Sequence, residues 1–169
     1  MSGRVRRLAL IVVAQMIASI LAPGTVASAE AKGSCYRFKD SERAVARKVN
    51  ATRSNRDKGR LRLDPELSRV ARQHTREMVK KGTLFHQTSA QFSRRITNWN
   101  MIAENVAYGS GVGQIHTMFM DSPLHAANIL NPGYRFVGTG VVTQGSRMWV
   151  TVIFEARSDP GTTLKMPDC

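Results

Sequence analysis

Cysteine is scarce in this sequence, with only Cys35 and Cys169 among 169 residues. Neither lies in a Cys-x-x-Cys pair or beside a histidine, which argues against a cysteine-ligated metal site. In an exported protein an even pair favours a disulfide. The disulfide ring would span nearly the whole domain. By restricting the unfolded chain, it would stabilise the fold by about 4 to 5 kcal/mol. Two unpaired thiols are the alternative.

Long hydrophobic runs are also scarce. The run from Leu8 to Ala22 is shorter than a membrane-spanning helix requires. Three arginines precede it and Ala27-Ser28-Ala29 follows it, which is the pattern of a secretory signal. We therefore predict a signal peptide over residues 1–29 and a secreted, extracellular protein. The alternative is an uncleaved membrane anchor.

Acidic residues are few, with 12 Asp and Glu against 25 Lys and Arg. Residues 30–95 carry 18 basic and 7 acidic side chains, whereas residues 96–169 carry 4 and 5. This asymmetry predicts a positive face for an anionic surface such as lipid headgroups, a cell-wall polymer or a glycan. A basic surface that only keeps the protein soluble is the alternative. No nucleic-acid partner is expected, because an exported chain without a reading motif is a poor candidate.

The order of the secondary-structure signals predicts an α+β domain. Helices are expected from residue 41 to about 52, from Pro65 to Lys81, over 112–120 and from Pro123 to Leu130, with a short helical turn over 91–98. The strongest signal is Asp64-Pro65 at a helix start with Gly82 at its end. This helix would present Arg69, Arg72, Arg76 and Lys80 as the positive face. Two strands, over 136–143 and 148–154, are joined by a hairpin.

Three polar residues lie within apolar segments: His86, Glu104 and His125. Burial of a carboxylate or an imidazole is costly without a partner, so we expect the three to meet in the fold. Two imidazoles and one carboxylate suit a divalent metal such as zinc, or acid–base chemistry on a water. The spacing has no His-Glu-x-x-His pattern, and a hydrogen-bonded polar network in the core is the alternative. His74 is interpreted as a core residue, and His116 as a weaker candidate for the same site.

The segments around these residues resemble a known family. Leu84-Phe85-His86, Ala103-Glu104-Asn105-Val106-Ala107, Ser122-Pro123-Leu124-His125-Ala126-Ala127-Asn128-Ile129-Leu130 and Val137-Gly138-Thr139-Gly140 follow in the order of its signature blocks. It is the superfamily of cysteine-rich secretory, antigen 5 and pathogenesis-related proteins (CAP), in particular its short bacterial secreted branch. The resemblance covers about residues 41–156. The expected organisation is a signal peptide (1–29), a leader (30–40), a CAP domain (41–157) and a tail (158–169) that holds Cys169.

The resemblance implies a three-layer α-β-α sandwich with a central antiparallel sheet and a His/Glu-lined cleft. Some family members bind zinc or another divalent metal there, and the matching residues here are His86, Glu104 and His125. Members with the full set have a second glutamate on the helix before the second histidine. This chain has none, and Asp121 is the nearest acid.

Two functions remain open at this stage. The first is a secreted binding protein whose cleft holds a divalent metal and a lipid, glycan or other small ligand, with a basic face for anionic surfaces. The second is a metal-assisted hydrolase in which Glu104 is the general base for a metal-bound water. The incomplete acid–base set favours binding. The sequence names neither the ligand nor the oligomeric state.

Overall fold

The computed structural model describes residues 35–97 and 99–156 together with Cys169. The predicted signal peptide, the first part of the leader and most of the tail lie outside the described residues. Within the leader, the side chains of Tyr36 and Phe38 are buried. This part of the leader therefore belongs to the folded domain.

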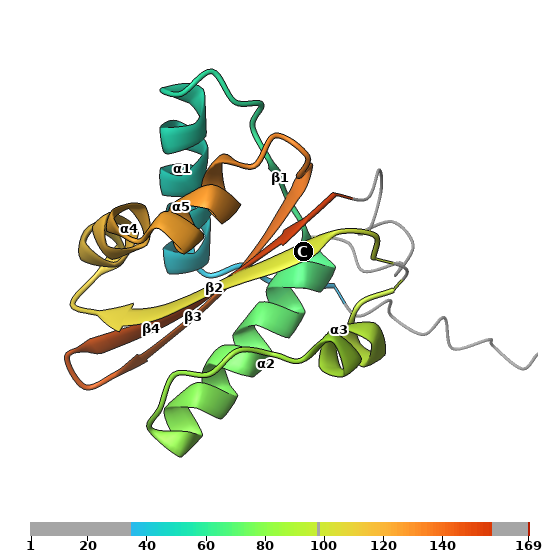
Figure 1. The fold of residues 1–169 in the computed structure, drawn as a ribbon. Helices are drawn as coiled ribbons and strands as arrows, with labels where there is room; N and C mark the ends of the chain where they lie inside the picture. The colour runs from blue at the N-terminus through green and yellow to red at the C-terminus, as the bar shows by residue number, and fades with distance from the viewer. Residues whose placement is uncertain (1–34, 98, 157–168) are drawn as a thin grey trace, which may run out of the picture. The chain divides into compact units, whose positions relative to one another are not determined.

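Five helices and four strands make up the described part of the chain (Figure 1). The helices are α1 (Asp40–Ser54), α2 (Pro65–Lys81), α3 (Ser89–Arg95), α4 (Val112–Asp121) and α5 (Pro123–Leu130). The strands are β1 (Arg62–Leu63), β2 (Ile102–Gly109), β3 (Phe136–Gln144) and β4 (Arg147–Glu155).

The predicted boundaries are confirmed best where the local signals are strongest. The Asp64 side chain accepts a hydrogen bond from the Leu67 amide at the start of α2, and Gly82 ends the helix with φ of 68°. Helix α1 continues beyond its predicted end at about residue 52 and includes Arg53. The Arg53 side chain is buried and donates to the carbonyl oxygens of Gly59, Ile129 and Asn131 at 2.7 to 2.9 Å. The hydrogen bonds to Ile129 and Asn131 join residues far apart in the chain, so the local sequence pattern does not indicate them.

The four strands form one sheet in the order β1-β3-β4-β2. Strands β3 and β4 form the predicted hairpin, and β2 pairs antiparallel with β4. The sheet is not wholly antiparallel, because the two-residue strand β1 pairs parallel with β3. Strand β2 lies at an edge, and this position determines the geometry of the candidate site.

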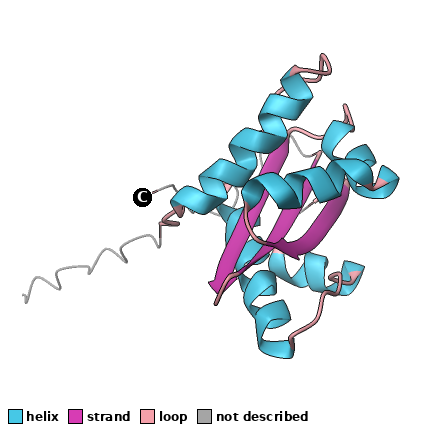
Figure 2. Cartoon of the chain, turned by 90° about the vertical axis from the view of Figure 1, so that its left-hand side faces the viewer, coloured by secondary structure: helices cyan, strands magenta, loops and turns pink. Residues whose placement is uncertain are grey.

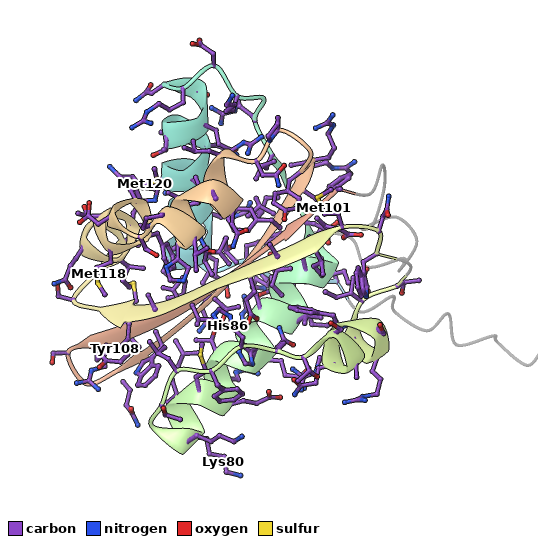
Figure 3. All side chains as sticks on the ribbon, viewed as in Figure 1. Lys80, His86, Met101, Tyr108, Met118 and Met120 are labelled. Carbon is purple, nitrogen blue, oxygen red and sulfur yellow. A yellow bond between two sulfur atoms is a disulfide. The ribbon has the colours of Figure 1, made fainter. Side chains whose placement is uncertain are left out.

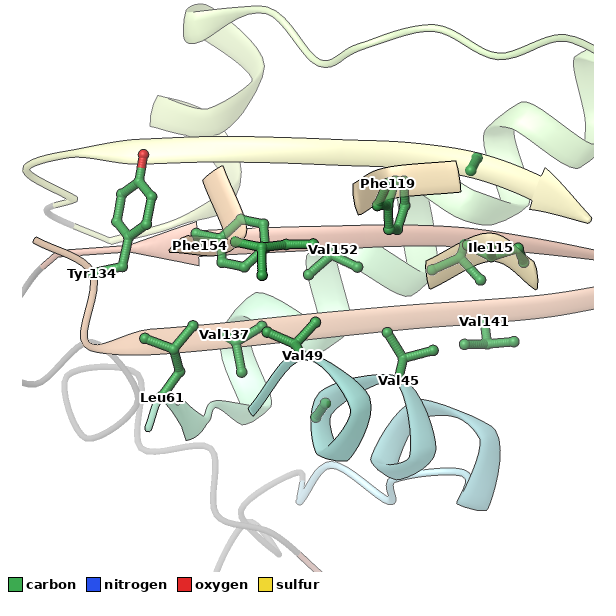
Figure 4. Packing of buried hydrophobic residues seen from close by; sticks show 14 residues of the cluster. Val45, Val49, Leu61, Ile115, Phe119, Tyr134, Val137, Val141, Val152 and Phe154 are labelled. Atoms are coloured by element: carbon green, nitrogen blue, oxygen red, sulfur yellow. The ribbon is translucent and has the colours of Figure 1, made fainter. Parts of the chain in front are cut away.

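The helices cover both faces of the sheet, as the predicted sandwich requires (Figure 2). One face packs against α1, α4 and α5, and its core includes Val49, Ile115, Phe119, Val152 and Phe154 (Figure 4). The other face packs against α2 and α3, with Leu67, Val70, Phe92 and Ile153 among its buried side chains. None of the described helices has the length and apolar character needed to cross a membrane.

A disulfide joins Cys35 to Cys169, with Cα atoms 5.1 Å apart. The Cys169 amide also donates to the Tyr36 carbonyl oxygen at 3.2 Å. The bond therefore ties the two ends of the domain together, as the even pair predicted.

Candidate functional site

Strand β2 presents polar residues to both faces of the sheet, because successive side chains in a strand alternate. Glu104 points to the α2 face, where the segment after α2 reaches it. Asn105 points to the other face and donates from its Nδ2 to the His125 carbonyl oxygen on α5 at 3.0 Å. His86 and Glu104 therefore contact each other on the α2 face, whereas His125 lies on the α5 face and is linked to β2 through Asn105.

The Glu104 carboxylate is buried and well supplied with donors. The Gln87 amide reaches Oε1 at 3.0 Å, the Gln87 side-chain Nε2 reaches Oε2 at 2.8 Å, and His86 Nδ1 lies 3.0 Å from Oε1. His74 Nε2 lies 3.7 Å from Oε2 but bonds to the Phe85 carbonyl oxygen instead. Both Glu104 oxygens thus serve to hold the segment after α2 against β2.

Gln87 and Arg95 belong to the hydrogen-bond network around Glu104, although the sequence patterns did not indicate them. Arg95 Nη1 donates to Gln87 Oε1 at 2.7 Å, and Arg95 Nη2 donates to Glu77 at 2.9 Å. Because the Gln87 oxygen accepts from Arg95, its amide nitrogen must face Glu104. The one sequence signal for Gln87 is its position beside His86, and no local pattern marks Arg95.

His86 is the accessible member of the site. Its side chain is 57% exposed and lies beside β2 (Figure 3). The hydrogen bond to Glu104 raises its pKa, against the opposing effect of partial burial. Because Nδ1 faces the carboxylate, Nε2 is the ring nitrogen left for a ligand, as in carboxylate–histidine–metal arrangements.

His125 approaches from the first turns of α5. Its backbone is held by Asn105, whose Oδ1 accepts from Asn128 Nδ2 at 2.8 Å. Its ring packs edge-on against Phe119, with centroids 5.3 Å apart. Burial lowers the pKa of His125, and the charge of His86 lowers it further. A positive charge on His86 therefore disfavours protonation of His125.

The remaining candidates have structural partners elsewhere. His74 is fully buried, as a core residue should be, and its ring packs edge-on against Phe85. His116 Nε2 lies 2.6 Å from Thr52 Oγ1, so its partner is on α1. Ser122 precedes α5 as its N-cap residue and forms no side-chain capping bond. Asp121, the nearest acid for the missing glutamate position, is exposed.

The donor set differs from a three-ligand metal centre. Within residues 35–97 and 99–156, no three His, Cys, Asp or Glu side chains form a group that would hold a metal ion. Glu104 is engaged by His86 and Gln87, which leaves the two imidazoles as the fitting donors. The predicted His/Glu-lined cleft is not shown either. The hollows that we describe have other linings, between α1 and α4, beside α3 and at the Tyr108 end of β2.

The predicted positive face on α2 is divided between structural and exposed groups. Arg72 forms an ion pair with the buried Glu42 carboxylate, with Nε 2.6 Å from Oε1, and lies over the Tyr36 ring. Arg69 donates to the Arg95 carbonyl oxygen at 3.0 Å. Arg76 and Lys80 are exposed. An external anion would therefore meet these two side chains first.

Comparison with known proteins agrees with the fold. The family model of the cysteine-rich secretory protein family (CAP) matches residues 46–154. YkwD of Bacillus subtilis (strain 168), an uncharacterised protein, is 30% identical over 129 residues, which cover 72% of this chain and 48% of YkwD. The chain thus spans about half the length of that relative.

Two solved structures share the fold at low identity. An outer surface protein from Borrelia burgdorferi aligns with a TM-score of 0.63 and 17% identity, covering 69% of this chain and 92% of its own. An extracellular protein from Bacillus anthracis that contains an SCP domain aligns with a TM-score of 0.62 and 20% identity, covering 69% and 40%. With the family model matched over most of the described domain, the chain belongs to the cysteine-rich secretory protein family.

Proposed function

We propose that this chain is a secreted binding protein in which His86 and His125 hold a divalent metal such as zinc. The observation that carries the proposal is the hydrogen bond between His86 Nδ1 and Glu104 at 3.0 Å. A carboxylate on one ring nitrogen fixes the tautomer and makes the other nitrogen a better metal ligand. Glu104 thus orients His86 rather than completing the metal's ligand set.

The proposed ligand set predicts modest affinity. Two imidazoles from the protein leave the remaining positions to water or to a bound ligand, unlike the four protein ligands of structural zinc sites. Such an open site suits a protein that uses the ion to recognise an oxygen- or nitrogen-bearing ligand. A lipid or glycan headgroup fits this description, as does another small polar molecule.

Zinc titration by calorimetry tests the metal site. At pH 7.5 we expect a single zinc per chain, and at pH 5 the affinity should fall by about tenfold or more, because protons compete for both imidazoles. His86→Ala and His125→Ala should each abolish the heat. The matched control is His116→Gln, which keeps a partner for Thr52 and should bind zinc normally. Heat that survives in both alanine variants would refute the site.

The exposed basic side chains Arg76 and Lys80 support a second element of the proposal, affinity for an anionic surface. Binding to vesicles of phosphatidylglycerol should weaken as the salt concentration rises from about 50 to about 500 mM, because exposed charges are screened. The double reversal of Arg76 and Lys80 to glutamate should weaken binding further, while His86→Ala leaves it unchanged. Salt-independent binding would contradict an electrostatic face.

A metal-assisted hydrolase is the alternative function. A bound divalent ion would supply a water of lowered pKa, and Glu104 would be the base. The engagement of both Glu104 oxygens by His86 and Gln87 favours binding over this role. Turnover that is lost in Glu104→Gln while zinc remains bound would establish the hydrolase. A substrate screen without turnover in the zinc-loaded protein would exclude it for those substrates.

A further inference from the structure

The outer edge of β2 has no strand beside it. The described sheet ends at β2, whose eight residues pair one-to-one with β4 and contain no bulge. The strand also contains neither proline nor lysine. Natural proteins commonly protect edge strands with such features, because an unprotected edge can pair with another chain. This edge lacks those protections.

The direction of each β2 peptide group follows from one hydrogen bond. The Ala156 amide donates to the Met101 carbonyl oxygen at 3.0 Å, one step beyond the Ile102↔Glu155 register pair. Hydrogen-bonded pairs alternate along an antiparallel ladder. The peptide groups that face β4 are therefore those of Ala103, Asn105 and Ala107. The peptide groups that face the outer edge are those of Ile102, Glu104, Val106 and Tyr108.

The outward main chain is accessible at Glu104. Glu104 is 8% exposed as a residue, but its side chain is only 3% exposed, so most of its exposed area belongs to the main chain. Asn105, which faces β4, is fully buried. Among the described residues, no hydrogen bond reaches the outward peptide groups of β2. These groups therefore have unused hydrogen-bonding capacity, and that of Glu104 is exposed to solvent.

Exposed hydrophobic side chains lie at both ends of this edge and on the segments beside it. Five large ones are exposed in the described part of the chain: Leu84, Met101, Tyr108, Met118 and Leu124. Met101 and Tyr108 lie at the two ends of β2, and Met118 on α4 lines a hollow together with Tyr108 (Figure 3). Leu124 stands next to His125 on α5, and Leu84 precedes His86. Both sides of the edge strand thus offer apolar contacts.

The charge beside this edge indicates what kind of partner fits. Arg147 lies over the Tyr108 ring at 4.3 Å, and Lys81 lies over the Phe85 ring at 4.3 Å. Neither cation has a carboxylate partner among the described residues. A second copy of this chain would bring the same cations to the contact. A segment that carries acidic side chains would be attracted instead.

We propose that the outer edge of β2 binds an extended, acidic segment of another protein, which adds to the sheet as a fifth strand. Main-chain hydrogen bonds to Glu104, Val106 and Tyr108 supply the pairing, and alternate apolar side chains of the segment contact the exposed hydrophobic residues on either side. Arg147 selects for acidic residues at the Tyr108 end. This interaction does not depend on the proposed metal site.

Amide hydrogen exchange on the zinc-free protein tests the pairing, with a probe selected from random twelve-residue peptides displayed on phage. Selected peptides should alternate apolar side chains and contain Asp or Glu. In the free protein, the amides of Ala103, Asn105 and Ala107 should exchange slowly and those of Glu104 and Val106 faster. A saturating synthetic copy of a selected peptide should slow Glu104 and Val106 by about tenfold or more.

Two variants distinguish strand pairing from nonspecific binding of the peptide. Tyr108→Pro removes an outward amide and spares the β4 ladder, so the selected peptide should bind at least about fivefold more weakly. Arg147→Glu should have a similar effect, whereas the matched control Arg60→Glu, an exposed arginine before β1, should have none. Thermal unfolding of each variant checks that the fold is retained.

Three results would overturn the proposal. One is a selection that enriches no peptide above the level found with Tyr108→Pro. Another is a bound peptide that leaves the exchange of Glu104 and Val106 unchanged. The third is slow exchange of these amides in the free protein. Because zinc is absent throughout, loss of zinc binding in His86→Ala bears only on the metal site, and the two proposals can fail separately.

Discussion

Helix α2 packs on β3 where glycines leave no side chain between the backbones, and Gly140→Ala should disrupt this contact. A Cβ atom added at Gly140 would lie 2.2 Å from both the Ala71 carbonyl carbon and the Arg72 amide nitrogen. Gly138 has a similar surrounding, with a Cβ 2.3 Å from the Leu67 carbonyl carbon. These contacts are with backbone atoms, which cannot turn aside as a side chain can.

The size of the effect follows from the displacement required. Relief to an ordinary contact of about 3.4 Å would move this part of α2 by about 1 Å away from the sheet. The helix buries Leu67, Val70, Ala71 and Met78 completely, so the movement would loosen a close-packed layer. Overpacked cores lose about 1 to 3 kcal/mol, and the backbone clash places Gly140→Ala at the upper end, about 3 kcal/mol.

Urea denaturation followed by circular dichroism measures this loss. For a domain of this size, about 3 kcal/mol lowers the urea midpoint by roughly 1.5 M. The matched control is Gly113→Ala in α4, where nothing lies within 4 Å of the added Cβ. Alanine there should stabilise the helix by about 0.5 to 1 kcal/mol. A loss below about 1 kcal/mol in Gly140→Ala would refute the argument that α2 requires direct backbone packing.

Three further predictions concern the buried charges and the covalent bond. Replacing Cys35 and Cys169 together by serine opens a ring that spans a sequence separation of 134, so the free energy of unfolding should fall by up to about 5 kcal/mol; thermal unfolding with and without a reductant checks this, and an unchanged midpoint contradicts it. Burial raises the pKa of Glu66 from 4.5 to about 7, so the native state retains a proton that the unfolded state releases, and stability should fall as pH rises from 4.5 to 7. Glu66→Gln should remove that part of the pH dependence in urea titrations, and an identical profile would show that Glu66 does not cause it. The hydrogen bond to Glu104 raises the pKa of His86, so this pair should stabilise the fold fully below about pH 6.5 and lose its effect as pH rises through the raised pKa; a histidine titration by NMR in Glu104→Gln should return the His86 pKa toward its ordinary value, and an unaltered titration would contradict the pairing.

Local signals predicted the helices and the hairpin well because their causes are local. Asp64-Pro65 and Gly82 specify the ends of α2 through a capping side chain and a left-handed residue, and both operate within a few positions of sequence. The end predicted for the first helix, at about residue 52, was too early because three carbonyl oxygens, two of them far along the chain, compensate the burial of the Arg53 side chain. The short strand β1 was missed for a similar reason, since two residues carry no periodicity.

The contact between His86 and Glu104 was predictable in outline from the cost of burying polar groups and from the resemblance of their segments to a family. His125 is linked to the same strand only through its carbonyl oxygen, which accepts from Asn105. The separate roles of these residues were not predictable. The sequence places a carboxylate between two histidines with no indication that Gln87 and Arg95 would occupy and orient it. Those hydrogen bonds join the segment after α2, helix α3 and strand β2, and no spacing rule relates them.

By itself, therefore, the sequence determined the order of the helices and the hairpin, favoured the cysteine pair, and indicated that His86 and Glu104 would meet. The tertiary structure alone decided that Glu104 orients His86, that Arg72 neutralises Glu42, and that β2 lies at an open edge of the sheet. The physical reason is that caps, periodicity and burial costs act on each segment separately. Hydrogen-bond partners and strand neighbours depend on which surfaces the folded chain brings together.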